Sequence, residues 1–357
     1  MHYVYEFIPH EIETMQEYID YIFDEVWCKA PSRQYRITLF NKNTELKAII
    51  TNNRFLATKT GKLFVDQIKA IYAVFKTLSQ NDIDRLARWF KANNHIEALC
   101  GNQPGEDPVT YEELKQYHHN LAVKLEVFYK FLWNSNIFSL QAIKSRIGKI
   151  SDHYSKFILK NTERICPFCG IHRIKGEFNS KREDYDHYLP KDIYPFNSVN
   201  LKNLAPTCME CNRSYKSAKD PLRDLSGSRR KTFYSYMAMK PPINIELHFL
   251  NGIVNLIPDN LDLRISCEGH EEEVQAWREI FSLDERYKAI YLDKHTTNYW
   301  FMQIEEMAIN KGYLIQEALE ELNRYARHSP LQEINFLKVP FLEACEKNNF
   351  FGSYSIR

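Results

Sequence analysis

Two cysteine pairs lie near the middle of the 357-residue chain, and each has the form Cys-x-x-Cys. The four residues are Cys166, Cys169, Cys208 and Cys211. A Cys-x-x-Cys turn presents two thiolates along one edge of a tetrahedron, so two such turns complete a closed zinc site. We expect one structural zinc ion per chain, because four protein ligands leave no position open for a substrate. A thioredoxin-like redox pair would explain one pair only, and no βαβ pattern surrounds either pair.

Polar residues that could perform chemistry stand between and beside these cysteines. Asp186 and His187 are adjacent, Asn203 follows His187 by 16 residues, and Asn212 directly follows the last cysteine. Lys216 is four residues beyond Asn212, on the same face of a helix that starts there. Because a four-thiolate zinc has a filled shell, any reaction in this segment must depend on these other side chains.

This arrangement resembles the HNH, or ββα-metal, endonucleases that are braced by a four-cysteine zinc. The resemblance rests on CPFC, DHYLP, NLAPTCMECN and Lys216, within residues 160–220. The three positions of the family name would fall on His187, Asn203 and Asn212. Asparagine in the last place departs from the name, but it is a frequent variant in this family. A looser likeness to bacterial defence-associated HNH proteins extends through YPFNSVN, whereas the first 150 residues resemble no family that we can name.

The resemblance implies a role for each residue. Asp186 and Asn212 would hold one catalytic Mg²⁺ or Mn²⁺ ion, since carboxylate and amide oxygens suit hard cations. His187 would activate a water molecule, because an imidazole with a pKa of about 6.5 can accept a proton at neutral pH. Asn203 would tie the backbone of the loop so that His187 stays aimed. Asp184 lies two residues before Asp186, would share its face on a strand, and could assist it.

Cationic residues in the same segment are candidates for phosphate contacts. They are Lys191, Arg213 and Lys216, and plain surface charge is the alternative for each of them. Residues 163–231 contain 14 Lys and Arg against 9 Asp and Glu, whereas the whole chain has a net charge of +1. Positive charge is therefore concentrated around the unusual motifs rather than spread over the chain.

Hydrophobic spacing predicts helices over most of the first 150 residues. LFVDQIKAIYAVFKTL places apolar side chains at steps of three and four, which is typical of one helical face. NDIDRLARWF repeats the pattern after a predicted cap at Asn81, and Thr110 and Glu113 have the spacing of a capping box. GNQPGEDP is predicted as a loop, and QYRITLF as a short strand.

The C-terminal part begins with a strand pattern. INIELHF alternates apolar and polar residues, and Asn251-Gly252 indicates a two-residue hairpin turn. Helical patterns return from about Glu271. We therefore predict a mostly helical α+β protein with a ββα-metal core. Its three predicted parts are a helical region over 1–155, a nuclease core over 156–235, and a β-hairpin with helices over 236–357.

Composition narrows the class of protein. Apolar residues make up 44% and charged residues 26% of the chain, as in globular proteins. We find no apolar run long enough to cross a membrane and no secretion signal at the start, so we expect a cytoplasmic protein. We expect the four scattered cysteines to be buried thiols, and these are Cys28, Cys100, Cys267 and Cys345.

The expected function is metal-dependent hydrolysis of DNA phosphodiester bonds. The resemblance further implies a role in bacterial defence against phage and an ATPase partner protein, with no membrane partner. Two alternatives stay open at this point. One is the same site acting on RNA such as tRNA, because nothing in the motif reads a 2′-hydroxyl. The other is a non-catalytic zinc module that binds nucleic acid or protein.

Overall fold

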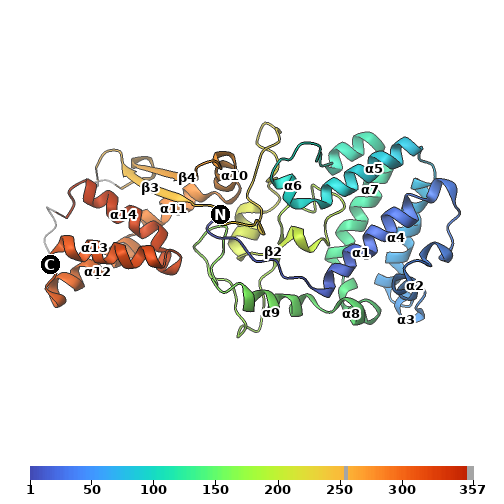
Figure 1. Cartoon of the computed structure of the whole chain (residues 1–357), viewed down its shortest axis with the longest axis horizontal. Coiled ribbons are helices and arrows are strands. Elements are labelled where there is room, and N and C mark those ends of the chain that lie inside the picture. Colours follow the sequence, from blue (N-terminus) through green and yellow to red (C-terminus); the bar gives the residue numbers. More distant parts are fainter. Residues whose placement is uncertain (253–255, 352–357) are drawn as a thin grey trace. The chain divides into compact units, whose positions relative to one another are not determined.

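The computed structural model of the chain describes residues 1–252 and 256–351. The chain forms two compact units, and each is described by itself (Figure 1). The helical unit consists of Val4–Arg164 and Ile174–Ala238, and the C-terminal unit of Met1–Tyr3, Ile165–Arg173 and Met239–Arg357. The division into three regions that we predicted from the sequence remains a prediction.

Most of the helical unit is built from helices. In chain order they are η1 (Glu11–Glu13), α1 (Thr14–Tyr21), η2 (Ile22–Trp27), η3 (Ala30–Ser32), η4 (Ile37–Phe40), α2 (Thr44–Ile50), α3 (Asn53–Leu56), α4 (Lys59–Phe75), α5 (Gln80–Asn94), α6 (Ile96–Cys100), α7 (Tyr111–Asn134), η5 (Ile137–Ser139), α8 (Gln141–Ile147) and α9 (Ile150–Lys160). Helices α4 and α7 pack side by side in the core of this unit (Figure 1).

The predicted helical stripe and capping box are confirmed. Phe64, Ile68, Ile71 and Phe75 are all buried along α4, so the apolar face read from the sequence is the face that packs into the core. Thr110 caps α7, and its side chain and that of Glu113 accept the reciprocal backbone hydrogen bonds of a capping box.

Two local predictions in this unit are wrong. Helix α5 is capped by Ser79 rather than Asn81, because Ser79 Oγ accepts from the Asp82 amide while the Asp82 carboxylate accepts from the Ser79 amide. The segment QYRITLF contains the short helix η4, not a strand. An isolated strand there would need a partner strand for its backbone groups, and a helical turn satisfies them locally.

A small antiparallel sheet and a short helix complete the helical unit. Strand β1 (Tyr185–His187) pairs with β2 (Leu204–Pro206), preceded by η6 (Leu201–Asn203), and the π-type helix η7 (Glu210–Lys216) follows. In the register of this sheet, Asp186 faces Ala205 and His187 faces Leu204. These two strands and two short helices thus carry Asp186, His187, Asn203 and Asn212.

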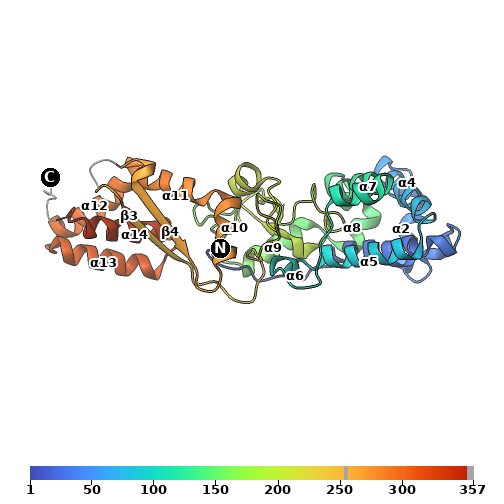
Figure 2. The same ribbon diagram turned by 90° about the horizontal axis from the view of Figure 1, so that it is seen from above.

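The C-terminal unit combines a second two-stranded sheet with helices. Its strands are β3 (Asn244–Phe249) and β4 (Leu261–Ser266), with η8 (Pro258–Asn260) between them. Its helices are α10 (Glu271–Phe281), α11 (Leu283–Leu292), α12 (Lys294–Lys311), α13 (Ile315–His328), η9 (Gln332–Ile334) and α14 (Asn335–Lys347). Figure 2 shows α14 beside β3, and α12, α13 and α14 packed together.

The predicted hairpin is present, but the prediction of a two-residue turn is wrong. The connection between the paired strands runs from Leu250 to Asn260 rather than through Asn251-Gly252 alone, and residues 253–255 within it lie outside the described part of the chain. Asn260 explains the longer connection, because its side chain accepts from the Asn251 amide and donates to the Gly252 carbonyl.

The fold class is confirmed at a coarse level: the described chain is mostly helical with two small antiparallel sheets, as expected for an α+β protein. Among the scattered cysteines, Cys100, Cys267 and Cys345 are buried as predicted, whereas Cys28 is half-exposed. No helix in the described ranges has both the length and the apolar character needed to span a lipid bilayer.

Candidate functional site

His187 is held in one orientation by its neighbours. Its Nε2 lies 2.9 Å from the carbonyl oxygen of Ser198, and a carbonyl can only accept, so Nε2 carries the proton. Nδ1 then has a free lone pair, and it makes no hydrogen bond with any described residue. Burial lowers the pKa of His187 to about 3, which keeps the ring neutral. Nδ1 is therefore the ring nitrogen that can accept a proton, and the lowered pKa makes this buried ring a weaker base than an exposed histidine.

The Ser198 carbonyl belongs to a buried loop that is anchored to the helices. Every residue from 194 to 200 is buried. The Ser198 hydroxyl donates to the Tyr129 carbonyl on α7 at 2.8 Å, and Asn197 Nδ2 donates to the Asn93 carbonyl on α5 at 3.1 Å. Phe196 packs against Phe90 of α5 and adopts φ +81°, a strained conformation for a bulky residue. The helices thus fix the loop that orients His187.

Asn203 brackets the chain that follows His187. Its Oδ1 accepts from the Leu189 amide at 2.8 Å, and its Nδ2 donates to the Leu189 carbonyl at 3.0 Å. The Tyr188 amide donates to the Asn203 carbonyl at 2.9 Å. The side chain is buried and occupied on both ends. Its position suits the supporting role expected from the sequence.

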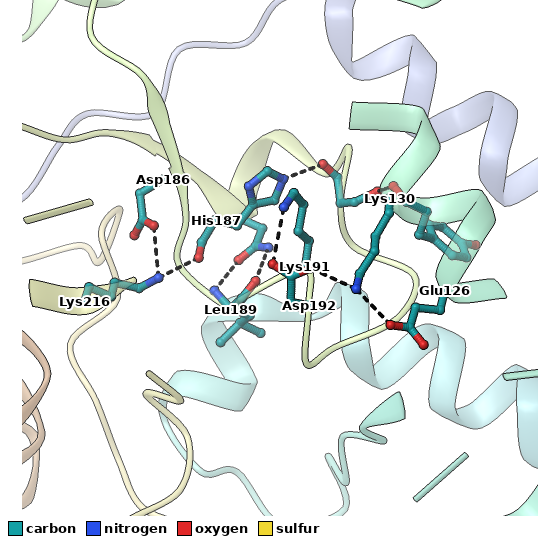
Figure 3. Close-up of polar contacts among 11 residues, drawn as sticks. Glu126, Lys130, Asp186, His187, Leu189, Lys191, Asp192 and Lys216 are labelled. Atoms are coloured by element: carbon teal, nitrogen blue, oxygen red, sulfur yellow. Dashed lines mark hydrogen bonds and ion pairs between the residues drawn. The ribbon is translucent and has the colours of Figure 1, made fainter. Parts of the chain in front are cut away.

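Asp186 lies on the opposite side of β1 from His187, because neighbouring strand residues point to opposite faces. It is buried, and its Oδ1 accepts from Lys216 Nζ at 3.0 Å (Figure 3). The same ammonium donates to the His187 carbonyl at 2.8 Å. Burial raises the pKa of Asp186, and the Lys216 charge opposes that rise.

The second carboxylate oxygen of Asp186 is an orphan. Oδ2 is buried and has no hydrogen-bond partner among the described residues. A buried anionic oxygen without a donor is costly, so such an atom indicates a missing partner. Asn212, on η7, has a side chain that makes no hydrogen bond within the described chain, and it is half-exposed. The two residues therefore provide free oxygen ligands of the type that hard cations prefer.

A pocket of about 530 Å³ opens beside His187. It is lined by Ile12, Trp133, Asn134, Ser135, Phe138, Ile150, Arg182, Asp184, Tyr185, His187, Lys191, Asn212 and Arg213. Asp184 is exposed and pairs with Arg213, whereas Asp186 does not line the pocket. The two carboxylates thus occupy different surroundings, although they are only two residues apart.

The candidate phosphate-binding residues differ in their placement. Lys191 and Arg213 line the pocket. Lys216 does not: its ammonium is fully buried between Asp186 and the His187 carbonyl, which does not fit the expected contact with a phosphate. Lys191 lies 3.4 Å from Asp192, which in turn pairs with Lys130 at 3.0 Å (Figure 3). This network holds the pocket rim to α7.

The four motif cysteines form a cluster. The sulfur atoms of Cys166, Cys169, Cys208 and Cys211 all lie within 4.8 Å of one another, and all four residues are buried. Such a cluster could hold a metal ion such as zinc, because thiolates at this spacing complete a tetrahedral shell. The cysteines are not paired in disulfides.

Each cysteine pair forms a turn suited to metal binding. The Ile171 amide donates to Cys169 Sγ and the Cys211 amide donates to Cys208 Sγ, each at 3.4 Å. Such donors stabilise thiolates. Gly170 has φ +69°, and a Cβ there would lie 2.6 Å from the ring of His2, so the turn requires glycine.

Sequence reasoning missed several residues of this site. It did not single out Trp133, whose ring centroid lies 4.7 Å from that of His187, or Phe138 beside it. Nor did it assign the Ser198 carbonyl, although YPFNSVN was noted. These residues come from α7, η5 and a loop, and their approach to His187 depends on long-range packing that no local pattern reveals.

Part of the chain is similar in sequence to a known protein. The chain is 37% identical over 68 residues to the Septu protein PtuB of Bacillus thuringiensis. That match covers 18% of this chain and 25% of the relative, so it spans only a quarter of the relative's length. No protein-family model and no solved structure matches the chain.

Proposed function

We propose that this protein is an HNH-type endonuclease that hydrolyses DNA phosphodiester bonds and acts in defence against phage. The observation that carries the proposal is His187, which is neutral, anchored through Nε2, and placed at a pocket with Nδ1 free. The similarity to a Septu protein supports the defence role, and the resemblance of the motifs supports the ββα-metal assignment.

In this proposal, Asp186 and Asn212 hold Mg²⁺ or Mn²⁺. Their fit rests on the orphaned Asp186 Oδ2 and on the Asn212 side chain, which makes no hydrogen bond with any described residue. A bound cation would neutralise charge on the scissile phosphate. His187 Nδ1 would take the proton of the attacking water while the water oxygen bonds to phosphorus and the P–O bond to the leaving sugar oxygen breaks. The Ser198 carbonyl holds the ring while it becomes positively charged. Lys191 and Arg213 position the phosphate backbone.

The ammonium of Lys216 takes a different role from the one that its spacing indicated. It compensates the buried Asp186 charge and fixes the His187 carbonyl, so we assign it to positioning of the site. Asp184 is at the pocket and pairs with Arg213, so it could assist as a second carboxylate. An ATPase partner protein, which the resemblance implies, belongs to the proposal as the source of control.

The test is a cleavage assay with plasmid DNA and with total RNA, in Mg²⁺, Mn²⁺ or EDTA. We expect DNA cleavage that needs the cation and falls by about 10²–10⁴-fold in His187→Ala, the usual effect of losing a general base. His119→Ala is the matched control, since His119 is exposed on α7 and does not line the pocket. Full activity of His187→Ala would refute the assignment, and cleavage of RNA alone would favour the RNA alternative.

A further inference from the structure

Two chemically different sets of side chains line the pocket beside His187. The cationic set consists of Arg182, Lys191 and Arg213. The apolar and aromatic set, here called the aromatic wall, consists of Ile12, Trp133, Phe138, Ile150 and Tyr185. Phosphate contacts would use the cationic set. They leave the aromatic wall without a function, because an anion gains nothing from apolar surface.

Trp133 is the largest side chain of this wall. It lies at the end of α7, with its ring perpendicular to His187 at 87° and to Phe138 at 74°. The Trp133–Phe138 centroid distance is 6.1 Å, and both rings are half-exposed. The indole Nε1 of Trp133 makes no hydrogen bond with any described residue. The ring is thus part of the pocket surface next to the proposed general base.

A tryptophan of the same unit shows what a purely structural role looks like. Trp27 is fully buried, and its Nε1 donates to the Ile68 carbonyl at 3.0 Å. Buried indoles usually find such a partner. Trp133 lacks both features, because its ring is half-exposed and its Nε1 makes no hydrogen bond with any described residue. Its position in the pocket lining leaves an aromatic face available to a ligand beside His187.

We propose that Trp133 and Phe138 form a stacking platform for one unpaired base of a DNA strand, next to the phosphate attacked by the water that His187 activates; this inference rests on the proposed nuclease function. Bases inside a duplex stack on each other and expose only their edges in the grooves. An aromatic wall beside the general base can be used only by a nucleotide that has left the stack. Every base has a π-face, so the platform favours single-stranded or locally unpaired DNA without reading sequence.

The test compares wild type, Trp133→Ala and Trp133→Phe on labelled oligonucleotides. The substrates are one single-stranded DNA, its duplex, and single-stranded RNA of the same sequence, all with Mn²⁺. We expect wild type to cut the single strand faster than the duplex. Trp133→Ala should lower kcat/KM on the single strand by about 5–150-fold, equivalent to 1–3 kcal/mol for one stacked base. Trp133→Phe should keep most of the activity. Trp133→Ala should lower duplex cleavage by a smaller factor than single-strand cleavage, because only an unpaired base can use the platform.

Binding provides a readout that does not depend on cleavage. In a His187→Ala background, Trp133→Ala should weaken the Kd for the single strand by a similar factor. Trp89→Ala is the control, because Trp89 is half-buried in the same unit but lies outside the pocket. Zinc content and circular dichroism that match the wild type would show that the variants are folded.

The outcomes separate the two proposals. An unchanged Trp133→Ala enzyme, or equal losses on single strand and duplex, would overturn the platform. If wild type cuts no substrate but Trp133→Ala still weakens single-strand binding, the nuclease proposal fails and the platform stands. A Trp133-dependent preference for RNA would overturn the commitment to DNA.

Discussion

At the scale of single residues, Asp186 shows how burial changes the meaning of a motif. From the sequence alone, Asp186 and His187 are adjacent polar residues of one open site. In the structure His187 faces a pocket, whereas Asp186 is buried against Lys216. A change at Asp186 therefore removes more than a proposed metal ligand, because it also leaves the buried Lys216 ammonium without its carboxylate partner.

The Lys216–Asp186 pair leads to a stability prediction. Lys216→Met should lower the free energy of unfolding by about 3–5 kcal/mol without added divalent cations, because Asp186 would keep a buried, uncompensated charge. Urea unfolding in EDTA measures this. The exposed Lys202 supplies the matched control, and Lys202→Met should change stability by less than about 0.5 kcal/mol. Equal shifts in both variants would contradict the role given to the pair.

At the scale of elements, the sequence predicted what local rules control. The stripe of α4 and the cap of α7 follow from spacing within one helix, and both are confirmed. The predicted turn between β3 and β4 was wrong because the connection is held by Asn260, nine residues from Asn251, whose side chain accepts from the Asn251 amide. The candidate site shows the same division. Its motif residues could be proposed from the sequence, but their partners in α7, η5 and the 194–200 loop come from elsewhere in the chain.

Helix α9 leads to a prediction about pH, because His153 joins it to the strand of the site. His153 Nδ1 accepts from the Tyr185 hydroxyl at 2.5 Å, and Nε2 donates to the Ile8 carbonyl at 3.1 Å. Burial lowers the pKa of His153 to about 4, below the value of about 6.5 for an unfolded histidine. Between these values the unfolded chain binds more protons, so stability falls as pH decreases through this window.

A His153→Gln variant removes that proton uptake. We expect it to be less stable than wild type at pH 7.5, because it loses the hydrogen bonds of the His153 ring with the Tyr185 hydroxyl and the Ile8 carbonyl. Its further loss on going to pH 4.5 should be smaller than that of wild type, by up to about 3 kcal/mol from 1.36 kcal/mol per pKa unit. Urea midpoints at several pH values measure this. Parallel curves for the two proteins would mean that His153 is not buried in its neutral form.

At the scale of the whole molecule, the charge distribution bears on affinity for DNA but not on recognition of a DNA sequence. The net charge is +1, and the excess of cations is confined to residues 163–231. Affinity for DNA that depends on so few cations should fall steeply with salt, since each phosphate contact releases a counterion. In our proposals the groups at the pocket contact phosphate or stack on a base, and neither contact reads sequence. Control of the proposed enzyme must therefore come from other surfaces of the chain or from the proposed partner.

The cysteine cluster leads to a prediction for the folding of the chain. Elemental analysis should find about one zinc per chain, since four thiolates form one closed site. Cys211→Ser should cause misfolding or aggregation rather than a slower enzyme, because the free energy of structural zinc binding is free energy of folding. Cys345→Ser is the control, as Cys345 is buried but outside the cluster. A folded, zinc-free Cys211→Ser protein would show that the chain does not depend on the metal, and the four sulfurs would then be ordinary buried thiols.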